Sequence, residues 1–331
     1  MSEIQVLQLY KKRKSRRICG QLSKKNTFVI KESIKMRLTN FLSNNCIKLQ
    51  AGFSFHRYMK LNLWVLPVFI LSIILSSCNG GKGIPELRII YLHHSTGRVI
   101  WNGGSSKEGK TNLQRLFREY NKENGRSYSI EEMTFPKAEP YGWKNYPFDY
   151  YNIWVKNGGD QLYKDELTLE ILTKEYQVII FKHCFPVSNI EEDDEAADID
   201  SEKKTVSNYK LQYLALRDKL HSFPETKFIL FTGAALTESA VTESAASRAR
   251  NFFDWVRNEW DQTGDNIFLW DLYELETEGD LYMQNKYAIS PGDSHPNKLF
   301  AANAVRLLFN RIIDVIENNG YNTSLTGSMG P

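Results

Sequence analysis

Four short apolar runs constrain the fold of this 331-residue chain more than any other feature of its sequence. Polar residues rarely interrupt these runs, and a stretch with helical spacing follows each of them. The runs are Leu87 to Leu92, Val178 to Phe181, Phe228 to Phe231 and Ile267 to Trp270. A continuous apolar run, unlike an alternating one, is typical of a strand buried on both faces, as in a parallel sheet covered by helices.

Candidate helices separate these runs, and Tyr128 to Phe135 is a fifth candidate strand with a weaker pattern. The candidate helices are Thr111 to Asn121, Gln161 to Lys174, Thr205 to Ser222, Ser244 to Trp260 and Pro296 to Asn319. Because strand and helix alternate, the sequence predicts one α/β domain with three α/β/α layers and a mostly parallel sheet. We expect this domain to cover residues 87–321, between a linker at 79–86 and a flexible tail at 322–331.

The segment Met59 to Cys78 has the architecture of a signal peptide. Lys60 precedes an apolar run from Leu63 to Leu75, which is 13 residues long and shorter than the roughly 20 residues of a spanning helix. The segment ends in Leu-Ser-Ser-Cys and resembles a bacterial lipoprotein signal, which implies that Cys78 is lipidated. We therefore expect an exported lipoprotein anchored to a membrane of the bacterial cell envelope; an uncleaved anchor or a buried core helix is the alternative.

Residues 1–58 differ in charge from the rest of the chain. They contain 13 Lys and Arg and two Glu, which leaves 29 Lys and Arg and 37 Asp and Glu after them. We interpret residues 1–58 as an extension upstream of the natural start; the alternative is a basic cytoplasmic tail before a signal anchor. The remaining chain is acidic, so nucleic acid is not an expected partner. Cys184 is the single cysteine after Cys78, so the sequence predicts no disulfide framework.

Polar side chains with catalytic potential follow the first apolar run. His93 to Gly97 reads HHSTG, and Lys182 to Asn189 follows the second run with further polar side chains. In an open parallel sheet, ligands and catalytic groups gather beyond the carboxyl ends of the strands. We therefore expect these segments to lie on one rim of the sheet.

A second informative stretch, Pro291 to Asn297, precedes the last candidate helix. Pro296 favours an extended backbone at His295, and side chains two apart in an extended segment point to the same side, which pairs Asp293 with His295. A serine hydroxyl needs a histidine to accept its proton and an acid to orient that histidine. Ser95, His295 and Asp293 supply these groups.

The blocks around Ser95 and His295 resemble those of the SGNH (GDSL-type) hydrolase superfamily, in an uncharacterised exported lipoprotein branch. The resemblance covers the chain from about Leu87 to Asn319 and implies a flavodoxin-like, five-stranded sheet. It also implies that Ser95 is the nucleophile, His295 the base and Asp293 the orienting acid. The first block reads His-His-Ser in place of the usual Gly-Asp-Ser, and the acid precedes His295 by two positions, as in the alginate-acetylating branch.

The same resemblance implies an oxyanion hole beside the nucleophile. The family combines the backbone N–H of the nucleophile with a glycine N–H and an Asn side chain, which here would be Ser95, Gly142 and Asn189. His94 and His183 are the candidate pocket residues. No cofactor and no metal is expected.

Other interpretations of the same residues remain open. Ser95 or Thr96 could cap a helix, and Cys184 could be a nucleophile, although a lone buried cysteine is usually inert. A zinc site would use residues from three segments: His93, His94, His183, Asp293 and His295. The acidic segment 189–201 fits a solvated loop better than a calcium site, and the aromatic segment 141–154 suits either sugar stacking or a packed lid.

The sequence therefore predicts a serine esterase or deacylase that acts through an acyl-enzyme. Its substrate would be a small-molecule or glycan ester. The alternatives are an O-acyltransferase on the same fold and a non-catalytic surface glycan-binding lipoprotein.

Overall fold

The structure, a computed structural model, describes residues 86–104 and 113–330. The predicted extension 1–58, the signal segment 59–78 with Cys78, and all of the linker except Glu86 lie outside the described residues. Within the described ranges, the helices are all too short or too polar to cross a membrane.

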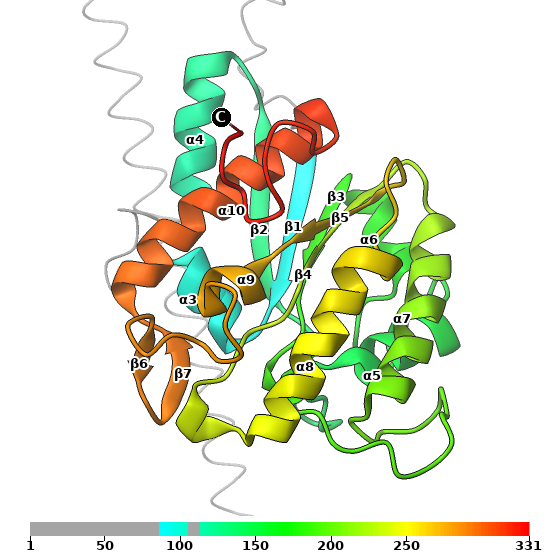
Figure 1. Cartoon of the computed structure of the whole chain (residues 1–331). Helices are drawn as coiled ribbons and strands as arrows, with labels where there is room; N and C mark the ends of the chain where they lie inside the picture. Colours follow the sequence, from blue (N-terminus) through cyan, green and yellow to red (C-terminus); the bar gives the residue numbers. More distant parts are fainter. Residues whose placement is uncertain (1–85, 105–112, 331) are drawn as a thin grey trace, which may run out of the picture. The chain divides into compact units, whose positions relative to one another are not determined.

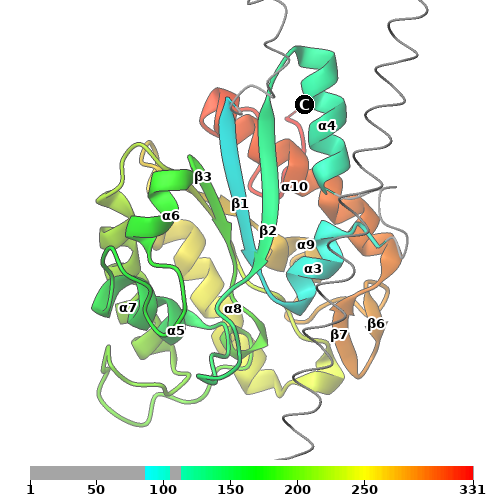
Figure 2. The ribbon, with the colours of Figure 1, turned by 180° about the vertical axis from the view of Figure 1, so that it is seen from behind.

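A five-stranded parallel sheet forms the centre of the domain (Figures 1 and 2). Its strands are β1 (Leu87–His93), β2 (Tyr128–Thr134), β3 (Val178–Phe181), β4 (Lys227–Phe231) and β5 (Ile267–Trp270). Their order, β2-β1-β3-β4-β5, is the flavodoxin-like order of doubly wound sheets. The predicted α/β/α class is confirmed, and this sheet is parallel throughout.

Alternate residues of each inner strand enter two separate hydrophobic cores, one on each face of the sheet. On β1, Ile90 and Leu92 belong to one core, whereas Ile89 and Tyr91 belong to the other. Fully burying one such side chain contributes about 1.5–3 kcal/mol. Burial on both faces explains why the sequence shows continuous apolar runs instead of alternation.

Helices cover both faces of the sheet. The core that contains Tyr91 lies under α3 (Ser95–Trp101), α4 (Leu113–Asn124) and α10 (Lys298–Asn318). The core that contains Ile90 lies under α5 (Pro147–Tyr150) with the π-helix η1 (Tyr151–Lys156), α6 (Leu169–Glu175), α7 (Val206–His221), and α8 (Glu243–Trp255) with the π-helix η4 (Val256–Trp260). Short α9 (Leu272–Thr277) follows β5.

The structure differs from the predicted elements near residue 161 and at the end of the chain. The predicted helix Gln161 to Lys174 begins only at Leu169, because Tyr163 and Glu166 exchange backbone hydrogen bonds in a tight turn. Residues 322–330 of the predicted flexible tail make fixed contacts: Asp314 accepts from the backbone N–H of Thr323 at 2.8 Å, and Trp270 donates to the Thr326 carbonyl at 3.0 Å.

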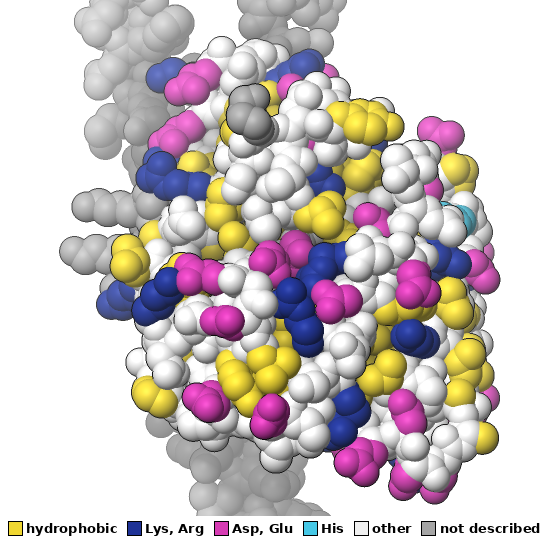
Figure 3. Space-filling model, viewed as in Figure 1, with side chains coloured by type: hydrophobic (Ala, Val, Ile, Leu, Met, Phe, Trp, Pro, Cys, Tyr) yellow, Lys and Arg dark blue, Asp and Glu magenta, His cyan; other side chains and the backbone are white. Residues whose placement is uncertain are grey.

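Figure 3 shows basic and acidic side chains intermingled on one face of the molecule. Some form exposed ion pairs, such as Lys286 with Glu278 at 2.6 Å. An exposed pair of this kind contributes only about 0–1 kcal/mol. Stability therefore depends mainly on the two cores.

Gly104 allows α3 to lie close to the start of α10. Its φ is +69°, and a Cβ there would lie 2.3 Å from the carbonyl oxygen of Lys298. No side chain fits at that distance. The contact joins the helix that begins with Ser95 to the helix that follows His295.

We predict that Gly104→Ala destabilises the domain by about 2–4 kcal/mol, because the methyl group forces α3 away from α10 in addition to the backbone strain. Gly125→Ala is the matched control, since Gly125 has φ +64° and no atom lies within 4 Å of the position that a Cβ would take, so it should cost only about 1 kcal/mol. Urea denaturation measures both. Equal losses would show that the close approach does not matter.

Candidate active site

Ser95 is the first residue of α3, directly after β1 and a single linking residue, His94. The N-cap position belongs to His94, and no side chain caps the helix there. The Ser95 side chain is exposed. The hydroxyl of Ser95 therefore does not serve as the helix cap that the sequence also allowed.

Gly97 makes the turn from β1 into α3 compact. A Cβ at Gly97 would lie 2.4 Å from the Cβ of His93, so a larger residue does not fit. The hydroxyl of Tyr91 donates to the Gly97 carbonyl at 3.1 Å. This turn fixes where Ser95 lies at the edge of the sheet.

A small hairpin that the sequence did not predict holds Asp293 and His295. It pairs β6 (Ala288–Ser290) with β7 (Asp293–Pro296) in antiparallel fashion. Between the two functional side chains, Ser294 is buried and accepts from the backbone N–H of Thr237 at 3.0 Å. The alternation along β7 therefore turns Ser294 inward and leaves Asp293 and His295 on the other side.

Ser95, His295 and Asp293 form a continuous chain of hydrogen bonds. The Ser95 Oγ and His295 Nε2 atoms are 2.9 Å apart, although the residues are 200 positions apart in sequence. The Nδ1 of His295 lies 2.6 Å from Oδ1 of Asp293. With its proton on Nδ1, the imidazole donates to the carboxylate and presents Nε2 to the Ser95 hydroxyl as an acceptor.

The surroundings of His295 hold its ring and its partner. The backbone N–H of His295 also donates to Asp293 at 3.0 Å. This bond, followed by the bond from the imidazole ring, lowers the pKa of the Asp293 carboxyl below its ordinary value, so the group remains an ionised acceptor at neutral pH. The Phe185 ring packs edge-on against the imidazole at a centroid distance of 5.2 Å.

Phe185 was not singled out from the sequence. It lies in the 3₁₀-helix η2 (Phe185–Val187) after β3. Its position after a buried run placed it on the predicted rim, but a single aromatic residue there carries no signal of contact with a histidine.

The two histidines before Ser95 have different surroundings. His93 is buried and its Nε2 lies 2.7 Å from Glu132; His94 is half-buried and contacts the Pro136 carbonyl. Burial lowers the pKa of both imidazoles, which favours their neutral forms. His94 thus links the Ser95 turn to the segment after β2.

The oxyanion-hole candidates are only partly compatible with the geometry. The N–H of Gly142 donates to Ala138 at 2.5 Å and is not available to a substrate. Asn189 is exposed after η2, and among the described residues no hydrogen bond links its side chain to Ser95. The N–H of Ser95 remains as a candidate donor at the start of α3.

His183, a predicted pocket residue, is fully enclosed instead. Its ring contacts the rings of Tyr150 and Tyr213, and both of its nitrogens are buried without a hydrogen-bond partner. Burial lowers its pKa to about 3, so the ring is neutral. His183 is buried because it follows β3 into the aromatic core that contains Tyr150 and Tyr213.

A buried lysine and a buried carboxyl lie beneath this rim. The Nζ of Lys182 contacts the Sγ of Cys184 at 3.2 Å, which places Cys184 in a packed position. Glu276 on α9 accepts from the backbone N–H of Ala235 at 2.6 Å. Burial raises the pKa of Glu276 to about 8, against the opposing effects of the Ala235 hydrogen bond and, less strongly, of Lys182.

The residues of the possible metal sites are arranged differently. In ranges 86–104 and 113–330, no group of three or more His, Cys, Asp or Glu is placed to hold a metal ion. The acidic segment 189–201 pairs with neighbouring side chains: Glu195 with Lys203 at 2.7 Å, Glu191 with Lys204 at 3.0 Å. These charges are therefore compensated within the protein.

The comparisons with known proteins add little to this geometry. No family model matches the chain, and no curated protein matches it. A solved structure of a carbohydrate esterase, described as having divergent catalytic and non-catalytic binding functions, is similar at 14% identity and a TM-score of 0.34. That similarity covers 71% of this chain and 67% of the other. At that TM-score it carries no argument about the site.

We predict that Glu276 makes the protein less stable as pH rises. Its pKa rises from 4.5 to about 8 on burial, so between these pH values the folded state holds a proton that the unfolded state has lost, and stability falls with increasing pH. Glu276→Gln should flatten this fall, measured as urea midpoints at pH 5 and pH 8. Glu274→Gln, a partly exposed site on the same helix, is the control and should leave the fall intact; an unchanged pH dependence in Glu276→Gln would contradict the prediction.

Proposed function

We propose that this protein is a serine esterase or deacylase that cleaves an acyl ester through an acyl-enzyme on Ser95. The observation that carries the proposal is the hydrogen-bonded chain from Ser95 through His295 to Asp293, with distances of 2.9 Å and 2.6 Å. Both lie within the reach expected of a nucleophile, its base and an orienting acid.

The proposed reaction begins when Ser95 Oγ attacks the ester carbonyl carbon while His295 Nε2 accepts the hydroxyl proton. The carbonyl electron pair moves onto oxygen, where the Ser95 N–H at the start of α3 would donate to it. As the tetrahedral intermediate collapses, the ester C–O bond breaks and His295 returns the proton to the departing alcohol. Water then attacks the acyl carbon while His295 accepts its proton; the bond between the acyl carbon and Ser95 Oγ breaks, His295 returns the proton to Oγ, and the carboxylic acid leaves.

Asp293 orients the base in this scheme. Its carboxylate accepts from Nδ1, which keeps the Nε2 lone pair directed at Ser95, and it stabilises the imidazolium that forms during attack. The acid itself remains ionised throughout, in agreement with the lowered pKa of its carboxyl group.

The open position of Ser95 favours an ester carried on a large molecule. Ser95 is exposed and the His295 side chain keeps 30% of its accessible surface. An acyl group that projects from a glycan can reach such a hydroxyl without the glycan entering a deep cavity, and water can reach the acyl-enzyme. An O-acyltransferase would instead have to transfer the acyl group to a sugar hydroxyl before water attacks the acyl-enzyme.

We predict that a fluorophosphonate labels Ser95 stoichiometrically and that the purified protein hydrolyses p-nitrophenyl acetate. Ser95→Ala should abolish labelling and lower kcat by roughly a thousandfold or more, because the nucleophile is lost. Mass spectrometry of the labelled peptide and initial rates provide the measurements. Ser290→Ala, at an exposed serine on the hairpin that also holds Asp293 and His295, is the matched control and should retain both properties.

Asp293→Asn distinguishes an oriented base from a fortuitous contact. The amide cannot accept from Nδ1–H in the same way, so kcat should fall by about 10²–10⁴-fold while the protein remains folded. A folded protein that is not labelled at Ser95 and turns over no ester would reject the proposal and favour non-catalytic glycan binding.

We further propose that Cys78 anchors the protein to a membrane through a lipid, on the basis of the segment Met59 to Cys78. Growth of expressing bacteria with an alkyne-bearing fatty acid should label the protein in the membrane fraction. Cys78→Ser should lose the label, whereas Cys184→Ser should keep it. Labelling that persists in Cys78→Ser would exclude this anchor.

A further inference from the structure

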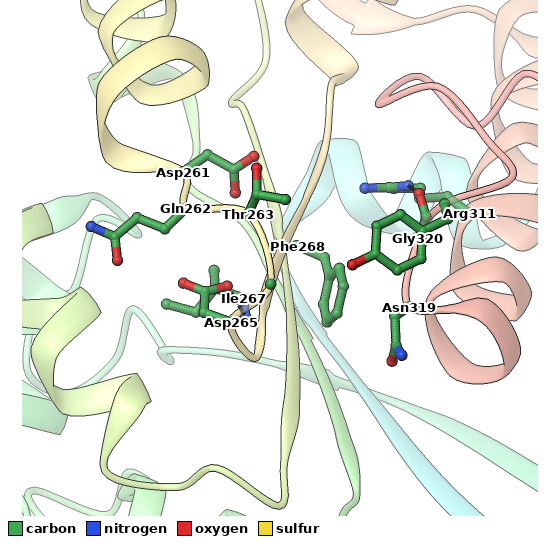
Figure 4. A pocket seen from close by; sticks show the side chains of 11 residues that line it. Asp261, Gln262, Thr263, Asp265, Ile267, Phe268, Arg311, Asn319 and Gly320 are labelled. Atoms are coloured by element: carbon green, nitrogen blue, oxygen red, sulfur yellow. Dashed lines mark hydrogen bonds between the residues drawn. The ribbon is translucent and has the colours of Figure 1, made fainter.

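A pocket lies beside the start of β5, at the amino-terminal end of the parallel strands (Figure 4). Its floor is Ile267 and Phe268 at the start of β5, whereas Ser95 follows the end of β1, and these strands are parallel within one sheet. One wall is the loop 261–265 and the other is formed by Arg311 with residues 319–321. The volume is about 320 Å³, within the range of small-ligand sites.

An adjoining hollow extends the pocket into a groove. It has a volume of about 430 Å³ and is also lined by His221 and Lys227. The two hollows share four lining residues: Gly264, Asp265, Phe268 and Asn319. The groove therefore has room for more than one small cyclic unit.

Hydrogen bonds fix both walls of the pocket in place. On one side, Asp265 contacts His221 at 2.8 Å and accepts from the Ile267 N–H at 2.9 Å. On the other, Asn319 accepts from Lys227 at 2.7 Å, and Arg311 donates to the Gly320 carbonyl at 2.9 Å. A ligand would meet a site that already has its shape, which lowers the entropy lost on binding.

Polar atoms without a hydrogen-bond partner face each other across this pocket. Figure 4 draws Asp261 and Arg311 on opposite sides of it. Among the described residues, the Asp261 carboxylate has no hydrogen bond or ion pair, and Arg311 donates through its Nε and Nη1 but not its Nη2. Arg311 is only 4% exposed. Neither Nη2 nor the carboxylate oxygens belong to the fully enclosed polar atoms of the described residues, so they reach the space of the pocket and are available to a ligand.

Neutral polar side chains and aromatic rings complete the lining. Gln262, Thr263 and Asn319 offer amide and hydroxyl groups. Phe268 lies at the floor, and Tyr321 keeps 71% of its accessible surface beside it. An exposed aromatic ring next to polar groups that both donate and accept suits a ligand with hydroxyl groups on an apolar ring.

We propose that this pocket is a second binding site, which takes a neutral sugar unit of a glycan. Adjacent hydroxyls of one sugar can donate to Asp261 and accept from Arg311 Nη2, since each hydroxyl has both capacities. The C–H face of the sugar ring packs on Tyr321. The adjoining hollow receives the next unit of the chain.

The chemistry of the lining favours a sugar over a zwitterion such as a free amino acid. A zwitterion would pair its charges with Asp261 and Arg311, but it would leave Gln262, Thr263 and Asn319 without matching groups unless its own side chain carries an amide or hydroxyl, as glutamine does. Burial, reinforced by the Asp265 carboxylate and opposed by the charge of Arg311, raises the pKa of Asp261 to about 6, so near that pH part of the population has a neutral acid, which no ammonium attracts. A polyol hydrogen-bonds either form.

Saturation-transfer difference NMR on the full chain tests this proposal, with N-acetylglucosamine, galactose, mannose and, as the zwitterion, glutamine as separate probes. At least one sugar should give signals that titrate with millimolar affinity. Tyr321→Ala and Asp261→Asn should each weaken that affinity about tenfold, through loss of the stacking surface and of a charged acceptor. Thermal unfolding of each variant checks that it is folded.

Two matched variants separate this site from the Ser95 site. Tyr141→Ala removes a second exposed tyrosine, which follows β2 and is 41% exposed, and Ser95→Ala removes the proposed nucleophile; both should bind the sugar unchanged. Sugar binding in a protein without esterase activity would uphold this inference and reject only the proposed function. No sugar signal, a signal lost in Tyr141→Ala but kept in Tyr321→Ala, or signals from glutamine alone would overturn it.

Discussion

The candidate site depends on the close approach of α3 to the start of α10. Ser95 begins the first of these helices, and His295 precedes the second. The absence of a side chain at Gly104 brings the backbones together, and the Ser95–His295 hydrogen bond spans 200 positions of sequence. Both helices pack on the same core, so the sheet face that they share sets the distance between hydroxyl and imidazole.

The carboxyl-terminal and amino-terminal ends of the parallel strands differ in the side chains that they carry. The carboxyl-terminal end, which carries Ser95, has a hydroxyl, an oriented imidazole and an ionised carboxylate at an exposed surface. The amino-terminal end has a groove with fixed walls, in which the Asp261 carboxylate and the Nη2 of Arg311 have no hydrogen-bond partner within the described part of the chain. If both proposals hold, one domain would bind a glycan at the amino-terminal end of the strands and deacylate it at the carboxyl-terminal end. The parallel sheet would hold the two sites at a fixed separation.

Much of the fold was predictable because strands buried on both faces appear in the sequence as continuous apolar runs. β3 and β5 have the predicted bounds, and α7 and α10 begin and end within two residues of their predicted limits. Elements that local hydrogen bonds hold together in polar sequence have no hydrophobic pattern from which to predict them. The β6–β7 hairpin and the tight turn between Tyr163 and Glu166 belong to this group, as does α3, whose seven residues have too little helical periodicity to detect.

The sequence by itself determined the fold class and the residue types that could act together, because strand burial and the Asp293–His295 alternation are local properties with fixed periods. It did not determine which polar side chains meet. His183 and Asn189 follow the same strand, yet the aromatic core encloses the first while the second is exposed. Contacts between distant segments depend on how whole helices pack, and only the tertiary structure decides that. The groove at the amino-terminal end of the strands is such a case, since its walls come from two segments with no shared motif.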